Sequence, residues 1–341
     1  MKIGIISPSE IAFRRFLPAL QKNKDFEFVG IAVASKSEWF GDKAASISDE
    51  GWAAIQEREI GRANPFIKNY GGKIFDSYQT LMEDVTVDCV YVPLPPALHY
   101  KWAKLGLECG KHIFVEKPST TCLADTQSLV DLAKQRGLAL HENYMFAYHE
   151  QLNYISQFVA SGEIGDVRLY RISFGFPLRQ LSDFRYKSAL GGGALLDCGG
   201  YVLKYAAMLL GDTTKIDYAR LNNIDGFEVD MYGSAALSND EGTTVQIAFG
   251  MDHDYKCELE VWGSKGTFYT NRVLTAPEGF APKATIRKGN EETTIHLSAD
   301  DAFSKSIKVF ADCVNNAAAR EAEYEVLLRQ ERLLEAFKSK M

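Results

Sequence analysis

The sequence contains no pair of cysteines spaced C-x-x-C, and its six cysteines are scattered singly along 341 residues. Zinc sites and disulfide frameworks need paired or clustered cysteines, so we expect neither a metal nor disulfides, and a reducing cytoplasm as the location. No apolar run approaches the ~20 residues that span a bilayer. The chain opens with the strand-like Lys2-Ile3-Gly4-Ile5-Ile6 instead of a secretory signal. These absences predict a protein without a membrane partner.

Long runs of basic residues are also absent, and the formal net charge is −7. Such a chain is a poor ligand for nucleic acid, so we expect no nucleic-acid partner. The hydrophobic share of 46% and the charged share of 24% are those of an ordinary globular protein. The length suffices for two domains, and no internal repeat or low-complexity segment interrupts them.

Strand-like and helix-like patterns alternate over the first 145 residues. Strands are expected at residues 2–7, 27–34, 73–75, 87–94, 112–116 and 138–143, and helices at 10–21, 77–82, 97–109 and 123–135. This alternation indicates βαβ units and a parallel sheet, so we predict an α/β fold with a Rossmann dinucleotide-binding domain over residues 1–145. Residues 47–70 interrupt the alternation. We interpret them as an insertion with an extra helix, most simply surface decoration, alternatively a substrate lid or a subunit contact.

The pattern changes after His149, where strand-like runs follow one another without long helices between them. Strands are expected at 167–176, 231–237, 243–249, 257–262, 267–271 and 293–297, and helices at 151–162, 194–210, 302–318 and 325–340. Consecutive strands indicate a largely antiparallel sheet, so residues 146–341 are predicted to form an α+β domain. We expect this domain to bind substrate, and its open sheet to join subunits into a homodimer or homotetramer.

The first strand runs into Ser7-Pro8-Ser9-Glu10-Ile11-Ala12, where a dinucleotide-binding domain carries G-x-G-x-x-G/A. The final alanine is permitted, but serines replace both leading glycines. A serine hydroxyl or N–H can still donate to phosphate at a helix N-terminus, whereas Pro8 removes one backbone donor. The loop is therefore a candidate pyrophosphate site. Taken alone, it is better explained as a plain strand–turn–helix connection.

The second expected strand ends in Ala34-Ser35-Lys36-Ser37-Glu38, without the Asp or Glu that holds the ribose 2′-hydroxyl of NAD. Ser35 and Lys36 suit a 2′-phosphate instead, so NADP (NADPH) is the predicted cofactor and NAD is less favoured. Ser35-x-x-Glu38 is also a capping box for the next helix, and the two roles are compatible.

A proline-rich loop that includes Pro93 and Leu94 follows the fourth strand and leads to His99. Ligands of open α/β sheets bind at the carboxyl ends of the strands, so we expect these three residues beside the cofactor. A single histidine is more often a capping or packing residue, and His99 is therefore given a supporting role.

Lys117 stands where the fifth strand ends, in Glu116-Lys117-Pro118. Pro118 has no N–H to donate, so strand pairing cannot continue past it. A lysine here is either a surface charge or a cation that points across the ligand cleft. In the second case it lowers the pKa of a neighbouring tyrosine or stabilises a developing alkoxide.

Asp197 and Tyr201 are spaced i, i+4 on the helix expected at 194–210, so they share one side of it. Tyr201 is a candidate proton donor and Asp197 its partner. Gly191-Gly192-Gly193 precedes the helix and lets the backbone approach a ligand. The alternative is a tyrosine packed on the sheet, with Asp197 as a structural hydrogen-bond partner.

The loop before these glycines carries Arg179, Arg185 and Tyr186. Arginine recognises phosphate with two parallel hydrogen bonds, so either arginine is a candidate contact for a diphosphate, although loop arginines are more often solvated. Tyr186 is the third candidate substrate contact.

Together these residues resemble the glucose-fructose oxidoreductase, inositol dehydrogenase and rhizopine-catabolism (Gfo/Idh/MocA) family of two-domain dehydrogenases. The landmarks are residues 110–118 and 191–197, and the resemblance covers almost the whole chain. Many members have a histidine where this chain has Tyr201, but the glucose-fructose oxidoreductase and dihydrodiol dehydrogenase branches have tyrosine. The resemblance implies that Lys117 and Tyr201 are the catalytic pair, with Asp197 orienting the substrate. It also implies that Glu116 and Asn143 belong to the cofactor site.

Shorter segments look like the nucleotide-sugar 3-ketoreductases of deoxysugar biosynthesis. They are residues 11–15, 90–95, 142–146, 183–186 and 260–264. That branch implies NADPH-dependent reduction of a 3-keto group on a dTDP-linked hexose. Two alternatives stay open: a dehydrogenase of a free sugar or a dihydrodiol, and a ligand-sensing homologue without turnover. The Ser7-Pro8-Ser9 loop favours the sensor, and the intact Lys117, Asp197 and Tyr201 set opposes it. The sugar and the direction of the reaction are open as well.

Overall fold

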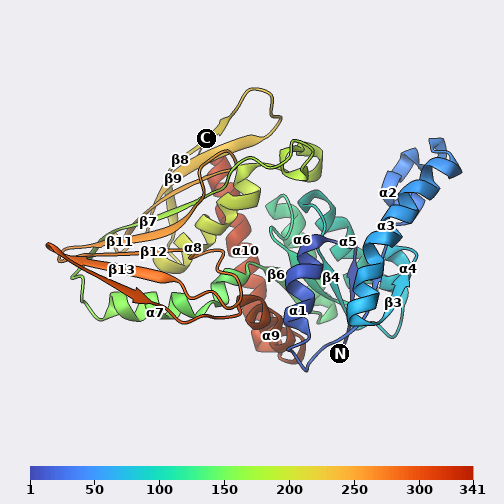
Figure 1. Cartoon of the computed structure of the whole chain (residues 1–341), viewed down its shortest axis with the longest axis horizontal. Coiled ribbons are helices and arrows are strands. Elements are labelled where there is room, and N and C mark those ends of the chain that lie inside the picture. Colours follow the sequence, from blue (N-terminus) through green and yellow to red (C-terminus); the bar gives the residue numbers. More distant parts are fainter. Residues whose placement is uncertain (341) are drawn as a thin grey trace. The chain divides into compact units, whose positions relative to one another are not determined.

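The computed structural model describes residues 1–340, which divide into two compact units (Figure 1). The first unit comprises Met1–Thr120, Ala124–Asn143 and Ser306–Leu327. The second comprises Thr121–Leu123, Tyr144–Lys305 and the chain from Leu328 onward. The sequence patterns do not indicate that Ser306–Leu327 joins the first unit. The boundary that we place at residue 145 otherwise stays a prediction.

The first unit is built on a six-stranded parallel sheet with the order β3-β2-β1-β4-β5-β6. Its strands are β1 (Lys2–Ile6), β2 (Glu27–Ala32), β3 (Lys73–Phe75), β4 (Cys89–Val92), β5 (His112–Glu116) and β6 (Leu140–Asn143). All six lie where the apolar runs predict them, and the predicted α/β class is confirmed. The strand order reverses between β1 and β4, which pair in parallel. In sheets of this kind a ligand binds at the carboxyl ends of the strands flanking that reversal.

Helices connect these strands. They are η1 (Ala12–Phe16), α1 (Leu17–Leu20), α2 (Lys36–Phe40), η2 (Gly41–Ser46), α3 (Asp49–Tyr70), α4 (Tyr78–Glu83), α5 (Pro96–Glu108) and α6 (Leu123–Arg136). Two further helices, α9 (Ala302–Asn315) and α10 (Ala317–Ser339), follow the last strand of the chain and belong to the first unit over Ser306–Leu327. The interpretation of residues 47–70 as mere decoration needs correction. The α3 helix contacts both β2 and β3, so it is the crossover helix between these strands.

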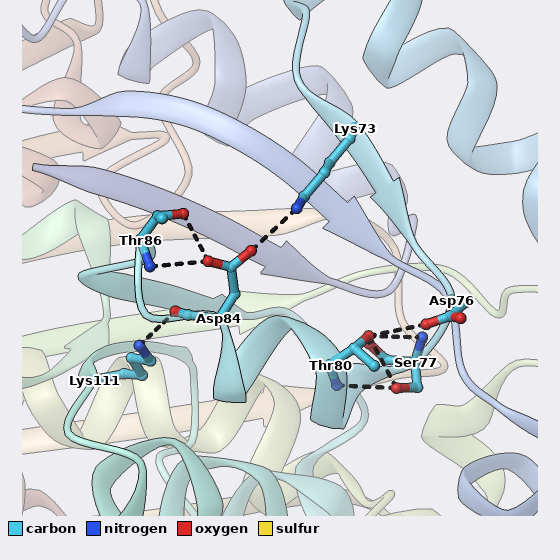
Figure 2. A network of polar contacts seen from close by, with 7 residues as sticks. All are labelled: Lys73, Asp76, Ser77, Thr80, Asp84, Thr86 and Lys111. Atoms are coloured by element: carbon cyan, nitrogen blue, oxygen red, sulfur yellow. Dashed lines mark hydrogen bonds and ion pairs between the residues drawn. The ribbon is translucent and has the colours of Figure 1, made fainter.

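A polar network fixes the turn that leads into β4 (Figure 2). The Asp84 carboxylate accepts hydrogen bonds from the N–H and hydroxyl of Thr86, at 2.9 and 2.7 Å, and from Lys73 at 3.1 Å. These donors, Thr86 first, lower the pKa of Asp84 to about 2. The ammonium of Lys111 donates to the carbonyl oxygens of Asp84 and Val87. This network holds the amino end of β4. The loops expected to bind the ligand lie at the opposite edge of the sheet, where the carboxyl ends of the strands are.

The second unit contains an eight-stranded sheet with the order β14-β13-β12-β11-β7-β10-β9-β8. Its strands are β7 (Val167–Gly175), β8 (Lys215–Asn223), β9 (Asp230–Ser238), β10 (Thr244–Gly250), β11 (Lys256–Gly263), β12 (Thr267–Asn271), β13 (Lys283–Lys288) and β14 (Glu291–His296). Neighbours pair antiparallel except β7 and β10, which are parallel. The predicted mostly antiparallel sheet is confirmed, but the sequence patterns missed β8 and β13. Both carry many exposed polar residues, which mask their alternation.

Helices pack on the buried face of this sheet. They are α7 (Glu150–Ala160), η6 (Leu195–Gly199), α8 (Gly200–Leu210) and the last turns of α10, with short helices η3 (Met145–Tyr148), η4 (Phe184–Tyr186) and η5 (Ser188–Leu190) in the connections. One segment, Ser188–Leu210, is long and apolar enough to cross a membrane, with a mean hydropathy of 1.2. Because 78% of its window is buried, and core helices pass the same test, it is weak evidence for a membrane.

Candidate active site

The loop after β1 has the backbone that a dinucleotide-binding turn requires. Ser7, which stands in place of the first glycine, has a φ of 72°, a conformation that glycine adopts without strain. Its N–H donates to the Ala32 carbonyl oxygen at 2.9 Å. The Ser9 hydroxyl accepts from the Ala12 N–H at 3.2 Å, so Ser9 caps the helix that begins at Glu10. First-turn N–H groups of such a helix lack partners within it and can bind phosphate.

The capping box at the end of β2 is confirmed. Glu38 accepts from the Ser35 N–H at 2.7 Å, and the Ser35 hydroxyl accepts from the Glu38 N–H at 3.4 Å. The ammonium of Lys36 donates to the Asp49 carboxylate at 2.8 Å, and this hydrogen bond lowers the pKa of Asp49. The predicted 2′-phosphate reader therefore stands beside an acidic partner that the sequence patterns did not reveal.

His99 links the loop after β4 to the turn after β5. Its ring nitrogens lie 2.6 Å from the Leu94 carbonyl oxygen and 2.7 Å from that of Pro118. The side chain is fully buried, and burial lowers its pKa to about 4, so the neutral ring donates to one of the two oxygens. This burial favours the packing interpretation. His99 positions Pro93–Leu94 and the Lys117-Pro118 turn rather than exposing a surface for direct cofactor contact.

Glu116 and Asn143 lie together at the carboxyl ends of β5 and β6. The Glu116 carboxylate accepts from the Tyr91 hydroxyl and from the Asn143 amide, both at 2.7 Å. Asn143 is fully buried and also accepts from the Ser306 hydroxyl at 2.9 Å. Burial raises the pKa of Glu116, against the opposing effect of these hydrogen bonds. Lys117 follows Glu116 directly, so its backbone continues from a strand end that these hydrogen bonds hold in place.

In the second unit, Asp197 is held by Arg185. The guanidinium Nε donates to Asp197 at 2.7 Å, and Nη1 donates to Asp183 at 3.2 Å. Burial disfavours the charged guanidinium, but the two carboxylates outweigh it and raise the pKa of Arg185. Because both carboxylates already neutralise Arg185, the geometry favours a role in orienting Asp197 over the predicted diphosphate contact.

Tyr201 belongs to an aromatic cluster. Its ring centroid lies 5.1 Å from that of Tyr144, 5.6 Å from Phe146 and 5.3 Å from Phe174, and the side chain is 8% exposed. The helix predicted over residues 194–210 is present and differs from a regular α-helix in one detail. Its first turn, η6, is a π-helix, which shifts Asp197 around the axis relative to Tyr201. Short π-helical segments often occur at functional sites.

The glycines before this helix pack closely against other residues of the chain. A Cβ at Gly192 would lie 2.4 Å from the Arg185 carbonyl oxygen, and one at Gly193 would lie 2.4 Å from Asp230 Oδ1. Asp230 accepts from the Leu195 N–H at 2.7 Å and caps the helix, while burial raises its pKa. Sequence patterns missed Asp230, because it is 35 residues away from its partner.

Arg179 and Tyr186 shape the loop before these glycines. The Tyr186 hydroxyl accepts from the Arg179 N–H at 2.8 Å, and Tyr186 is buried. The Arg179 guanidinium lies 5.2 Å from the Phe176 ring centroid. A hollow of about 250 Å³ is lined by Arg179, Gln180, Ser182 and Asp183. Arg179 is therefore better placed than Arg185 for an anionic ligand, and Tyr186 supports the loop. Among residues 1–340, no group of three or more His, Cys, Asp and Glu side chains could hold a metal.

Two family models match the chain. Residues 1–144 match "Oxidoreductase family, NAD-binding Rossmann fold", and residues 152–269 match the GFO/IDH/MocA C-terminal domain. The chain belongs to the Gfo/Idh/MocA oxidoreductase family. The predicted family, and with it an oxidoreductase on a Rossmann fold, is confirmed.

Two similar curated relatives are dTDP-3,4-didehydro-2,6-dideoxy-alpha-D-glucose 3-reductases. The one from Actinomadura kijaniata is 34% identical, over 99% of this chain and 95% of its own. The one from Streptomyces violaceoruber is 37% identical, over 93% of this chain and 86% of its own. A crystal structure of a 3-ketoreductase from Actinomadura kijaniata, in complex with NADP and TDP-benzene, superposes with a TM-score of 0.88. It is 34% identical, with 100% of this chain and 97% of that chain covered.

Proposed function

We propose that this oxidoreductase uses NADP(H) to transfer hydride to or from a sugar carbonyl or alcohol, with a dTDP-linked 3-keto-hexose as the substrate. The observation that carries the proposal is the full-length likeness, at 34% identity, to a 3-ketoreductase that holds NADP and TDP-benzene. Both curated relatives are named for 3-reduction of a dTDP-linked sugar. A cytoplasmic location and a homodimer or homotetramer are proposed with it.

The residues of the first unit fit the cofactor. Ser7 supplies a turn with positive φ, Ser9 caps the following helix, and Lys36 offers a cation where NAD-specific domains place a carboxylate. These residues would hold the pyrophosphate and the 2′-phosphate. Glu116 and Asn143, which are hydrogen-bonded to each other, would line the cofactor site next to Lys117. Bound NADPH supplies the hydride for carbonyl reduction.

We assign the proton chemistry to Tyr201, as the acid that protonates the carbonyl oxygen. Lys117 would stabilise negative charge on that oxygen. Asp197, held by Arg185, would orient the sugar, and Arg179 is the preferred contact for the diphosphate. Lys117 belongs to the first unit and Tyr201 to the second.

Titration with NADPH and NADH, followed by energy transfer from tryptophan, tests the cofactor first. Tight NADPH binding with weak NADH binding supports the proposal, and binding of neither would leave the sensor as the better hypothesis. Turnover of a dTDP-linked keto-sugar, compared with free sugars and dihydrodiols, then separates the ketoreductase from the alternative dehydrogenase.

A matched pair of variants tests the acid. Tyr201→Phe should lower turnover by about 100-fold or more, because it removes the proton donor. Tyr205→Phe is the control: Tyr205 lies one turn later on α8, and its buried hydroxyl has no hydrogen-bond partner in residues 1–340. Near-normal turnover of Tyr201→Phe would remove Tyr201 from the mechanism.

A further inference from the structure

The crossover helix α3 reaches the loop that would bind the cofactor pyrophosphate. Arg62, in the middle of α3, donates from Nη2 to the Pro8 carbonyl oxygen at 2.9 Å. Pro8 stands between the two serines that replace the fingerprint glycines.

A buried carboxylate fixes the direction of Arg62. Nη1 lies 3.1 and 3.2 Å from the two oxygens of Glu59, whose side chain is only 3% exposed. A guanidinium held at Nη1 by a buried carboxylate has little freedom, so its Nη2 points at Pro8 with a fixed geometry. Arg58 pairs with the same carboxylate at 3.3 Å, and its guanidinium lies over the Trp39 ring, 5.7 Å from the ring centroid.

The loop that Arg62 holds is strained. Ser7 has a φ of 72°, a left-handed conformation that is unfavourable for a residue with a side chain. The loop also lacks the N–H that Pro8 cannot supply. Tyr78 is buried, and this burial raises its pKa to about 12, with smaller effects from the Ser7 side chain, Glu59, Glu38 and Arg62.

We propose that Arg62, oriented by Glu59, is a positioning residue that clamps the Ser7-Pro8-Ser9 turn in its strained, phosphate-binding conformation. The clamp replaces what the two glycines supply in a G-x-G-x-x-G turn, where positive φ needs no external support. This inference rests on the proposed binding of a nicotinamide dinucleotide. It concerns the pyrophosphate loop, which NADPH and NADH share, and not the 2′-phosphate.

The test is a set of dissociation constants for NADPH and NADH. Arg62→Ala should weaken both cofactors by a similar factor, roughly tenfold, as expected for loss of one charged hydrogen bond. Arg58→Ala, the matched control, should leave both unchanged. Ser7→Gly in the Arg62→Ala background should restore most of the affinity, because glycine reaches positive φ without the clamp. Arg62→Lys keeps the charge but loses the paired N–H donors of the guanidinium, so it should also weaken the binding of both cofactors. This variant replaces Arg62→Ala in the test if Arg62→Ala does not fold.

Several outcomes would overturn the clamp. They are unchanged affinity in both Arg62 variants, a loss confined to NADPH, and failure of Ser7→Gly to rescue. Thermal unfolding without cofactor separates this inference from the proposed function. Ser7→Gly should raise the melting temperature of the unaltered chain more than that of the Arg62→Ala chain, since only a clamped loop stores strain. If the unaltered chain binds neither cofactor, the proposed function fails. If it binds both and the Arg62 variants bind equally well, only the clamp fails.

Discussion

At the scale of single residues, we propose that the charge of Lys36 decides which nicotinamide cofactor the first unit prefers. Lys36 is the first residue of α2, which follows β2, and it is paired with the exposed Asp49. An exposed pair of this kind is worth little, so a 2′-phosphate can displace Asp49 from the ammonium. Lys36→Ala should raise the dissociation constant of NADPH about tenfold or more and leave that of NADH unchanged. Lys43→Ala, an exposed lysine in η2, is the control, and equal loss of both cofactors would contradict this role.

We expect Glu116 to give the stability of the chain a pH dependence. Burial raises its pKa in the folded state above the ordinary value of about 4.3. Between the two values the folded state binds more protons than the unfolded state, so the free energy of unfolding falls as the pH rises through this window. Glu116→Gln should remove that fall. Urea unfolding at a series of pH values from 4 upward should therefore show the variant gaining stability relative to the unaltered chain, and parallel curves would show that Glu116 titrates normally.

At the scale of helices, substitution by alanine should have opposite effects on stability at two glycines. A Cβ at Gly200 in α8 would lie 2.1 Å from the Tyr144 hydroxyl oxygen, whereas one at Gly61 in α3 meets nothing within 4 Å. Gly200→Ala should destabilise the chain by about 1–3 kcal/mol through overpacking. Gly61→Ala should stabilise it by about 0.5–1 kcal/mol, because alanine favours the helix. Chemical denaturation measures both, and a stabilised Gly200→Ala chain would mean that Tyr144 does not pack against α8.

The elements that the sequence predicted are those with a strong local pattern. Apart from the partly polar β6, the strands of the first sheet are short apolar runs bounded by turns, and all six fold where expected. β8 and β13 were missed because exposed polar residues dilute their alternation. The π-helical turn η6 has no local signature, since close packing such as that of Tyr144 on Gly200 depends on the tertiary fold.

The candidate site divides in the same way. Ser7, Lys36, Lys117, Asp197 and Tyr201 follow from motifs, because their spacing from strand ends and helix turns is local. The supporting residues do not. Arg62 is 54 residues from Pro8, and Asp230 is 35 residues from Leu195. Nothing in a local pattern connects such partners, so only the folded chain reveals them.

At the scale of the whole molecule, the exposed face of the second sheet is where we expect a second copy to bind. Paired positions form a row across six strands: Tyr269, Glu260, Arg171, Gln246, Ala236 and Tyr218. Tyr218 is 57% exposed and Trp262 is 50% exposed. The Arg171 guanidinium lies 5.7 Å from the Trp262 ring centroid. Exposed aromatic residues and arginine are enriched at protein interfaces.

If two copies bind through this face, a substitution within it should dissociate the oligomer. Trp262→Glu would place a carboxylate on the face that also carries Glu260 and would remove the aromatic surface, so two copies should no longer associate. Light scattering during gel filtration should show a dimer or tetramer for the unaltered chain and a monomer for Trp262→Glu. Val85→Glu, which changes a 92% exposed residue of the first unit, should leave the mass unchanged. A monomeric unaltered chain, or an intact oligomer of Trp262→Glu, would show that this face does not join the subunits.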